Sequence, residues 1–518
     1  MIKLTIDGKP IEVAEGTSVM QAASDLGIEV PSMCYKEGFH CHPSCMVCMV
    51  KDERYGKLQP SCALPAEEGM IINTTDQEVF ESRKEALELL LSDHVGDCEA
   101  PCRIACPAYM DIPKMNRLIA EGGLAKAVEI VKEEIAIPLI LGYICPAPCE
   151  KVCRRNTIDS PVHICQLKKF VAVEDLNGED KFFPSKKKST EKKIAIIGSG
   201  PAGMTAAFHL LKSGHEVSIF EKEAQAGGSL RTQRMAKEIP SEAIDAEISF
   251  LVEFGLNLQT NSKIDSNKIQ QVIADHDAVV LATGLKTDEV LLNDLKVNER
   301  GIVINQDTYQ TSIDKVFACG SALKVNKMAV RSVAQAKAAA FAVDQYVHGQ
   351  NIDKIHRMFN SKFGKLLDEE FDAYLQEAPN RSDAASDFSQ VKPYDFETMK
   401  SEAERCMHCD CRKLDNCLLR IHADSYQVDR RKYLLSDRCK VTKFVKEDVV
   451  VYEPEKCIKC GLCVETAAKH QEDIGLTYIG RGFDVRIKVP YDKDLNEALT
   501  KAANECAEIC PTGAISKV

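Results

Sequence analysis

The pattern of apolar and polar positions predicts a strand–loop–helix–strand unit in the middle of the chain. Residues 194–197 are four consecutive apolar residues, which is typical of a short buried strand. Gly198, Gly200 and Gly203 follow at G-x-G-x-x-G spacing, and a helix is expected to begin behind them. A second strand over residues 216–220 ends at Glu221, about 20 residues downstream of the loop. This arrangement predicts a dinucleotide whose pyrophosphate lies at the helix N-terminus and whose ribose meets Glu221.

The remaining pattern and the net charge exclude several classes of protein. Residues 1–7 alternate like a strand and do not resemble a signal peptide. The longest apolar candidate, residues 135–145, is too short to span a bilayer. The net charge of −12 makes nucleic acid an unsuitable partner. We therefore expect a cytoplasmic protein with no membrane span and no nucleic-acid partner.

The cysteines indicate the chemistry. The chain has 518 residues and 23 cysteines, and in a long acidic chain without an export signal these indicate metal ligands rather than disulfides. Their clustered spacing favours iron–sulfur centres.

The first cluster of cysteines follows a C-x10-C-x2-C-x13-C pattern: Cys34, Cys45, Cys48 and Cys62. It resembles the 2Fe–2S ferredoxin domain that opens the large iron–sulfur subunit of respiratory complex I and related hydrogenases, which implies a β-grasp domain with a 2Fe–2S cluster. A zinc site is the alternative. An amphipathic helix over residues 79–94 follows, and His94 and Cys98 have H-x3-C spacing. This again resembles the complex I subunit, where the histidine ligates a 4Fe–4S cluster; a histidine that only caps the helix dipole is the alternative.

The next cysteines resemble another family. They are Cys98, Cys102 and Cys106, then Cys145, Cys149 and Cys153, followed by Pro161-Val-His-Ile164. The pattern looks like the helical domain of the glutamate synthase small subunit and of dihydropyrimidine dehydrogenase, which holds two 4Fe–4S clusters. The resemblance implies one cluster on Cys98, Cys102 and Cys153, with His94 nearby, and another on Cys106, Cys145 and Cys149. Lys168 stands near the family's last ligand position, so we expect Cys165 to replace it, with a buried core thiol as the alternative.

Residues 192–350 resemble FAD-binding reductases. The resemblance rests on the glycine-rich loop, Gly227-Gly-Ser-Leu-Arg231, the strand ending in Ala282-Thr-Gly284, the late strand ending in Cys319-Gly-Ser321, and a helix from Ala329 to Gly349. It implies FAD rather than the nicotinamide nucleotide that the first loop alone would allow. Ser321 stands where the family has an aspartate for the ribityl chain. The implied FAD-binding residues are Gly198, Ser199, Gly200, Pro201, Ala202, Gly203, Glu221, Lys222, Gly228, Ser229, Arg231, Ala282, Thr283, Gly284, Gly320, Ser321 and Val330.

The family's second nucleotide domain is absent from the sequence. Only 17 residues separate Gly284 from Ile302, and no second G-x-G-x-x-G is present. A βαβ unit needs ≈ 30 residues or more. We therefore expect no NAD(P)H domain.

Two cysteine groups follow near the C-terminus. Four cysteines lie within 12 residues and predict a 4Fe–4S cluster, with zinc as the alternative and Cys439 as a possible replacement ligand: Cys406, Cys409, Cys411 and Cys417. The last group, with Gly480-Arg-Gly482, resembles the second 4Fe–4S segment of the complex I subunit: Cys457, Cys460, Cys463 and Cys510. Cys41, Cys319, Cys439 and Cys506 are left over.

These patterns predict a multidomain α/β protein with FAD, one 2Fe–2S cluster and four 4Fe–4S clusters. The expected parts are a 2Fe–2S domain (1–78), a helical two-cluster domain (79–180), a linker (181–191), an FAD domain (192–350), a helical linker (351–400), a Cys-rich 4Fe–4S segment (401–449) and a complex I-like 4Fe–4S domain (450–518).

We expect an electron-transferring oxidoreductase subunit that passes electrons between FAD and the clusters. The expected partners are redox subunits: a complex I-like flavin subunit, hydrogenase, formate dehydrogenase or ferredoxin. A stand-alone flavin-dependent reductase and a non-catalytic electron-wire scaffold are the alternatives. No residue of the sequence is predicted to be catalytic.

Overall fold

The chain folds into two compact units, and each unit contains segments that are far apart in the sequence. The computed structural model describes residues 1–178, 180–232, 238–284, 294–326, 328–376, 378, 395–433, 440–441, 445–446 and 448–517. One unit, called here the outer unit, comprises Met1–Ala100, Met358–Gln376 and Cys409–Val518. The other, the inserted unit, comprises Pro101–Arg357 and Glu377–His408. The boundary at Ala100 divides the predicted helical domain over residues 79–180, because the helix before it packs within the outer unit.

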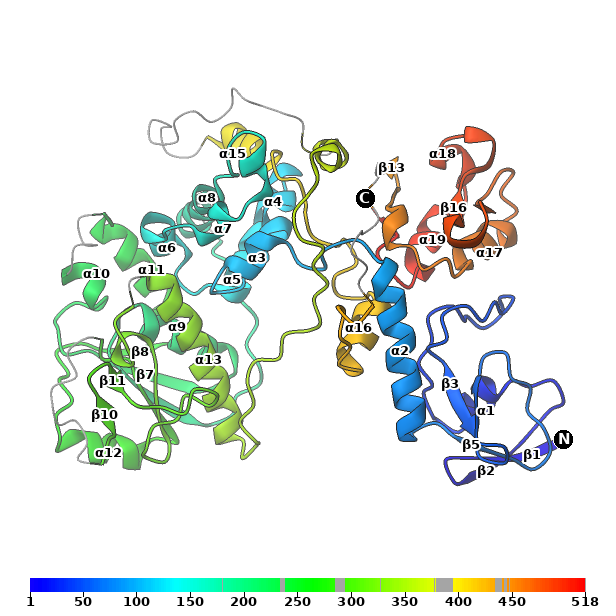
Figure 1. Cartoon of the computed structure of the whole chain (residues 1–518). Helices are drawn as coiled ribbons and strands as arrows, with labels where there is room; N and C mark the ends of the chain where they lie inside the picture. The colour runs from blue at the N-terminus through cyan, green and yellow to red at the C-terminus, as the bar shows by residue number, and fades with distance from the viewer. Residues whose placement is uncertain are drawn as a thin grey trace. The chain divides into compact units, whose positions relative to one another are not determined.

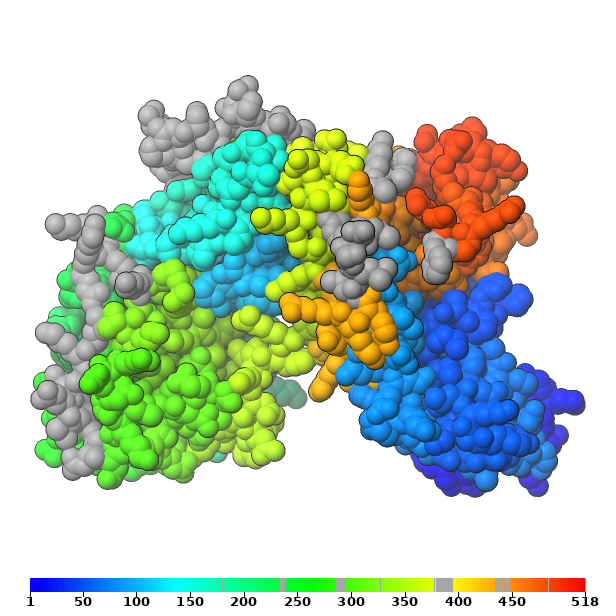
Figure 2. All heavy atoms as spheres, in the orientation of Figure 1, coloured from blue at the N-terminus to red at the C-terminus, as the bar shows by residue number. Residues whose placement is uncertain are grey.

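The outer unit begins with a five-stranded sheet of order β2-β1-β5-β3-β4 (Figure 1). The strands are β1 (Ile2–Ile6), β2 (Lys9–Val13), β3 (Met49–Asp52), β4 (Lys57–Pro60) and β5 (Met70–Asn73). β1 pairs with β5 in parallel, and the other pairs are antiparallel. Helix α1 (Val19–Asp25) packs its buried side chains into the same core. Figure 2 shows the N-terminal residues, in dark blue, gathered together.

The rest of the outer unit supports the later cysteines. The predicted helix over residues 79–94 is α2 (Gln77–Asp93), which Asp76 caps by accepting a hydrogen bond from the Glu78 amide. A second sheet has the order β13-β14-β17. The remaining elements are α14 (Phe371–Leu375), α16 (Leu418–Ser425), β13 (Val445–Lys446), β14 (Val450–Tyr452), α17 (Leu462–Lys469), β15 (Thr477–Ile479), β16 (Arg486–Lys488), α18 (Leu495–Ala498), α19 (Ala503–Ile509) and β17 (Ile515–Lys517).

The first part of the predicted helical linker, residues 351–365, forms neither helix nor strand. Their polar groups are engaged elsewhere: the Phe359 amide donates to Asp424, and the Ser361 carbonyl accepts from the Cys98 amide. Residues 358–376 are therefore an integral part of the outer unit.

A parallel five-stranded sheet forms half of the inserted unit, in the order β12-β9-β6-β7-β8. The strands are β6 (Lys193–Ile197), β7 (Glu216–Phe220), β8 (Asn257–Gln259), β9 (Ala278–Leu281) and β12 (Val316–Ala318). One face is covered by α9 (Pro201–Lys212), α11 (Ser241–Glu253) and α13 (Ala329–Val347), and the other by α12 (Lys268–Asp275). A hairpin of β10 (Val297–Asn298) and β11 (Gly301–Ile302) and the short α10 (Ser229–Thr232) complete this half.

Short helices form the other half of the inserted unit and share the core of the sheet. They are α3 (Pro101–Ala105), α4 (Ile112–Ala120), α5 (Leu124–Glu134), α6 (Pro138–Ile144), α7 (Pro148–Lys151), α8 (Ile164–Asn177) and α15 (Phe396–Ala403). One continuous core contains Phe170 of α8, Phe208 of α9 and Met399 of α15. The predicted multidomain α/β class is thus confirmed. Within the described residues, every helix is too short or too polar to cross a membrane.

Candidate flavin and iron–sulfur sites

A cavity of about 650 Å³ lies where three parallel strands of the inserted unit end. Gly198 follows β6, Glu221 follows β7 and Ala282 follows β9, and all three line the cavity. Ligands of open α/β sheets bind at this carboxyl edge. The sequence-predicted residues that line it are Gly198, Ser199, Gly200, Pro201, Ala202, Glu221, Lys222, Gly228, Ser229, Ala282, Thr283, Gly284 and Ser321.

Two glycines make the turn before α9 possible. Gly198 has φ +103°, and a Cβ there would lie 2.6 Å from the Ala282 carbonyl oxygen. A Cβ on Gly203 would lie 1.9 Å from the Gly198 carbonyl oxygen. The loop therefore leaves a bare backbone at the N-terminus of α9, which fits a pyrophosphate.

Glu221 holds this loop in place. One carboxylate oxygen accepts hydrogen bonds from the Ser199 amide, at 3.0 Å, and from the Ser199 hydroxyl. The other oxygen accepts from the Glu223 amide at 3.0 Å. Because each carboxylate oxygen has more than one lone pair, Glu221 can still meet a ribose hydroxyl. Thr283 adds a buried hydroxyl that has no hydrogen-bond partner within the described residues and lines the same cavity.

Four residues predicted to bind the flavin do not line this cavity. Arg231 is turned away, because it donates to the Ala226 carbonyl and pairs with Asp245. Gly203 and Gly320 allow close packing of the chain around the loop. A Cβ on Gly320 would lie 2.6 Å from the Ala202 Cβ. Val330 lines a neighbouring cysteine cavity instead.

Sequence reasoning missed several residues that line the flavin cavity. Ser262 and Lys263 follow β8, the next parallel strand, so a correct assignment of that strand would have indicated them. Asn326, Ala329 and Ser332 belong to the start of α13 and the loop before it, where no motif marks them.

The four cysteines predicted to hold a 2Fe–2S cluster lie together and are buried. The Sγ atoms of Cys34 and Cys45 are 3.4 Å apart. The Cys62 thiol hydrogen-bonds with Cys34 and with Cys48. The hydrogen bond between Cys62 and Cys48 lowers the pKa of the Cys48 thiol to about 7. Four convergent thiols suit iron or zinc. Cys41 stays outside this set, with its thiol donating to the Cys62 carbonyl at 3.4 Å.

A cavity in the inserted unit brings Cys165 together with its predicted partners. Cys106, Cys145, Cys149 and Cys165 line it. The Cys165 thiol hydrogen-bonds with Cys145 and Cys149, so it is part of the thiol group rather than of the apolar core. The cavity also contains Lys168.

The last predicted group is also assembled, within the outer unit. One cavity is lined by Cys457, Cys460, Cys463 and Cys510. Burial raises the pKa of the Cys457 thiol to about 11. Cys506 is buried nearby, and its thiol donates to the Cys463 carbonyl at 3.6 Å.

Two predicted cysteine groups are divided differently by the structure. Cys98 lies with Cys411 and Cys417 in the outer unit, and the Cys411 amide donates to the Cys98 carbonyl at 3.0 Å. Burial, followed by the charge of Cys411, raises the pKa of Cys98 to about 11. Cys102 and Cys153 belong instead to the inserted unit, as does Cys406. The predicted group of Cys98, Cys102 and Cys153 therefore contains residues of both units, and so does the predicted group of Cys406, Cys409, Cys411 and Cys417. Both groups stay predictions.

His94 is well suited to hold a metal. The side chain is buried, and a hydrogen bond with the backbone of Lys456 fixes it. Burial lowers the pKa of the imidazole to about 3, so the ring is neutral. Its Nδ1 has no hydrogen-bond partner within the described residues. A neutral imidazole with an unpartnered buried nitrogen fits a ligand, although His94 is also the residue that ends α2.

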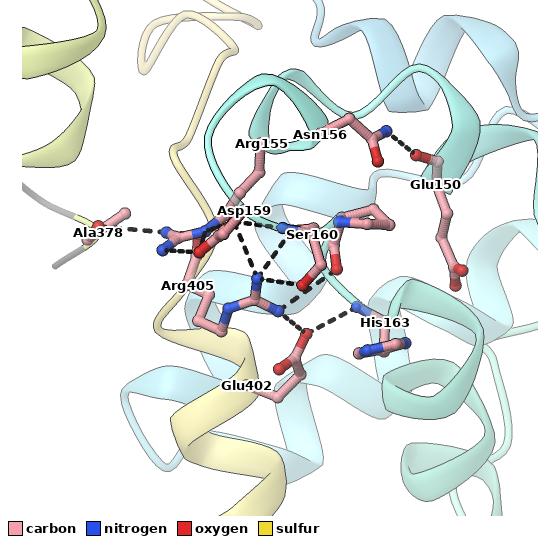
Figure 3. Close-up of polar contacts among 10 residues, drawn as sticks. Glu150, Arg155, Asn156, Asp159, Ser160, His163, Ala378, Glu402 and Arg405 are labelled. Atoms are coloured by element: carbon pink, nitrogen blue, oxygen red, sulfur yellow. Dashed lines mark hydrogen bonds and ion pairs between the residues drawn. The ribbon is translucent and has the colours of Figure 1, made fainter. Parts of the chain in front are cut away.

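A buried polar network in the inserted unit joins the segment before Cys406 to the loop after Cys153 (Figure 3). Arg155 donates to both oxygens of Asp159 and, at 2.8 Å, to the Arg405 carbonyl. Arg405 pairs with Glu402 at 2.7 Å and donates to the Ser160 carbonyl at 2.7 Å. Arg155 and Arg405 also influence the Cys153 thiol electrostatically. Cys406, next to Arg405 in the sequence, is therefore anchored beside the loop that carries Cys153.

Two further cysteines, Cys319 and Cys439, have no predicted cluster. Cys319 is fully buried, and burial raises the pKa of its thiol to about 12, as for a core residue. Cys439 lies outside the described residues.

Comparison with known families finds iron–sulfur and oxidoreductase domains in successive parts of the chain. Residues 1–77 match the 2Fe-2S iron-sulfur cluster binding domain. Residues 76–179 match the dihydropyrimidine dehydrogenase domain II, 4Fe-4S cluster. Residues 166–340 match the pyridine nucleotide-disulphide oxidoreductase family. The fold and these matches define an iron–sulfur oxidoreductase.

Curated relatives share part of the chain. The NAD-dependent dihydropyrimidine dehydrogenase subunit PreT of Salmonella typhimurium is 35% identical over 191 residues, 36% of this chain and 46% of the relative. The NADP(+)-dependent formate dehydrogenase subunit beta of Moorella thermoacetica is 34% identical over 36% of this chain and 29% of the relative. The NADPH-Fe(3+) oxidoreductase subunit beta of Geobacter sulfurreducens is 30% identical over 36% of this chain and 28% of the relative. The match covers less than half the length of each of these relatives.

Proposed function

We propose that the chain is an electron-transferring FAD and iron–sulfur subunit of a cytoplasmic multi-subunit oxidoreductase. FAD exchanges two electrons and each cluster exchanges one, so the pair can connect two-electron and one-electron chemistry. The relatives support a subunit role, since each is named as a subunit of an oxidoreductase or dehydrogenase. A complex I-like flavin subunit, hydrogenase, formate dehydrogenase or ferredoxin would be a suitable partner.

One observation carries this proposal: the first turn of α13 separates the flavin cavity from a cysteine cavity. Ala329 and Ser332 line the flavin cavity. Val330, between them in the sequence, lines the cavity of Cys106, Cys145, Cys149 and Cys165. A single helical turn thus separates the two cavities.

The observed groups support a revised set of ligands for the 4Fe–4S clusters. The first set is His94, Cys98, Cys411 and Cys417. The second is Cys102, Cys153 and Cys406, which all belong to the inserted unit. The third is Cys106, Cys145, Cys149 and Cys165, and the fourth is Cys457, Cys460, Cys463 and Cys510. The revision changes which ligands share a cluster and leaves Cys409 without an assigned cluster.

In this proposal, NADH and NADPH transfer no hydride directly to the flavin of this chain. Between Gly284 and Val316, the described residues contain only the β10–β11 hairpin and the loops around it. A nicotinamide must be held against the flavin ring by a fold that binds its adenine and pyrophosphate. This chain has one G-x-G-x-x-G, and Glu221 already serves that loop.

Cofactor content tests the proposal. We expect the anaerobically purified chain to contain one FAD and about 18 iron atoms, the sum for one 2Fe–2S and four 4Fe–4S clusters. Zinc in place of two or more clusters, or a purified chain without flavin, would overturn it.

A further inference from the structure

Lys168 has an unusual position for a lysine. It lies on α8, three residues after Cys165, and is only 4% exposed. It lines the cavity that contains Cys106, Cys145, Cys149 and Cys165. A buried lysine is rare unless a negative charge accompanies it.

The groups that can balance the charge of Lys168 are chiefly cysteines. Burial lowers the pKa of Lys168, whereas Cys165, Cys145, Cys149 and Cys106, in this order, raise it when they are thiolates, as cluster ligands are. Two carboxyls, Glu150 and Glu247, also sense Lys168.

Backbone amides already hold both of these carboxyls. Glu150 accepts from the Cys165 amide at 2.8 Å. Glu247 accepts from the Leu139 and Ile140 amides at 2.6 and 3.1 Å. Burial raises the pKa of Glu247 to about 8, which diminishes its charge near neutral pH. The cysteine group is therefore the principal counter-charge of Lys168.

We propose that the Lys168 ammonium raises the reduction potential of the 4Fe–4S cluster held by Cys106, Cys145, Cys149 and Cys165. When this cluster takes up one electron it gains one negative charge, while Lys168 keeps its proton. A fixed positive charge lining the cavity stabilises the reduced state more than the oxidised state. Because the cavity is buried, the interaction is weakly screened. This inference rests on the proposed cluster at these four cysteines.

Replacement of Lys168 by methionine removes the charge and keeps an unbranched side chain. We expect Lys168→Met to reduce the ratio of reduced to oxidised cluster at a fixed potential about tenfold. For one electron this corresponds to a midpoint about 59 mV lower.

Lys169 provides a matched control. Lys169 is the next residue of the same helix. Its ammonium lies 3.6 Å from the centre of the Tyr143 ring. It does not line the cysteine cavity. Lys169→Met removes the same charge from the neighbouring position and should leave the midpoint unchanged.

The experiment is an anaerobic redox titration of the full chain followed by electron paramagnetic resonance. The signal that Cys165→Ser removes, together with about four iron atoms, identifies the cluster in question. If Cys165→Ser removes no iron, the proposed cluster itself is wrong. If the cluster is present but its midpoint is the same in Lys168→Met and the unaltered chain, the role of Lys168 is wrong and the cluster stands.

A variant that loses the cluster also gives a definite result. Lys168→Gln keeps a polar group in the cavity while removing the charge. Loss of the cluster in both Lys168→Met and Lys168→Gln would show that Lys168 holds the site together, which overturns a tuning role. A lower midpoint in either variant with full iron content, and none in Lys169→Met, would support it.

Discussion

The two units each bury a lysine beside cysteine thiols, but they balance its charge differently. In the inserted unit, the principal counter-charge of Lys168 is the group of four thiols. In the outer unit, Lys456 is 5% exposed and acts on Cys98 and Cys411, yet its ammonium also lies 2.7 Å from a carboxylate oxygen of Glu453. The lysine–glutamate pair is nearly neutral as a whole, whereas Lys168 contributes a positive charge.

We expect this difference to give the proposed clusters of the two sites different reduction potentials. The net charge near a cluster changes the relative stability of its two redox states, and it does so without changing the ligands. We expect the site beside the flavin cavity to attract electrons more strongly than the Cys98 site. The predictions below test first the sites and then the charges on which this comparison depends.

Loss of a whole cluster is the largest expected effect. Cys98→Ser and Cys411→Ser should each remove about four iron atoms and the same electron paramagnetic resonance signal if both thiols ligate one cluster, as we propose. Cys102→Ser should remove a different signal. If Cys98→Ser and Cys102→Ser removed the same signal and Cys411→Ser another, the assembly of the outer site would be wrong.

The second largest expected effect is destabilisation of the inserted unit. Arg405→Met leaves Glu402 buried without its ion-pair partner, at a cost of about 3–5 kcal/mol. Hydrogen exchange of α8 and α15 measures the free energy of local opening. Lys151→Met, at an exposed position on α7, is the control and should change it little. Equal exchange in both variants would show that the network in Figure 3 does not stabilise this segment.

Removal of His94 has a more local effect. His94→Ala should alter or remove the signal that Cys98→Ser removes, while the 2Fe–2S signal persists. If His94 only ends α2, the change should cost about 1 kcal/mol of stability and leave all spectra as they were.

The smallest effect tests the balanced pair directly. Replacement of both partners, Lys456→Met with Glu453→Gln, removes one positive and one negative charge. We expect the midpoint of the Cys98 cluster to move less than that of the Cys106 cluster in Lys168→Met. A shift of equal size in the redox titration would contradict the comparison.

The sequence was sufficient where a site is encoded by neighbouring residues. The loop at Gly198, the carboxylate at Glu221 and the four cysteines around Cys34 all lie as expected, because short-range spacing and the carboxyl edge of a parallel sheet fix them. The match to 2Fe–2S and 4Fe–4S families confirms these two classes of domain.

Long-range assembly was not predictable in the same way. Cys98 and Cys411 meet only because the chain leaves the outer unit after Ala100, returns to it at Met358–Gln376 and enters it again at Cys409. No local spacing indicates this, and the resemblance to the helical two-cluster domain groups Cys98 with Cys102 and Cys153 instead. Arg231 was misplaced for a related reason: its partner Asp245 lies on another helix, and a motif says nothing about that ion pair.

Anaerobic stopped-flow reduction of the isolated chain tests the central claim most directly. Reduced ferredoxin, a protein too large to enter the flavin cavity, should bleach the flavin through the clusters. NADH or NADPH should not do so rapidly, because the chain has one nucleotide-binding loop and it serves the FAD. Fast flavin bleaching by NADH or NADPH without a partner, or no bleaching by reduced ferredoxin, would contradict the account.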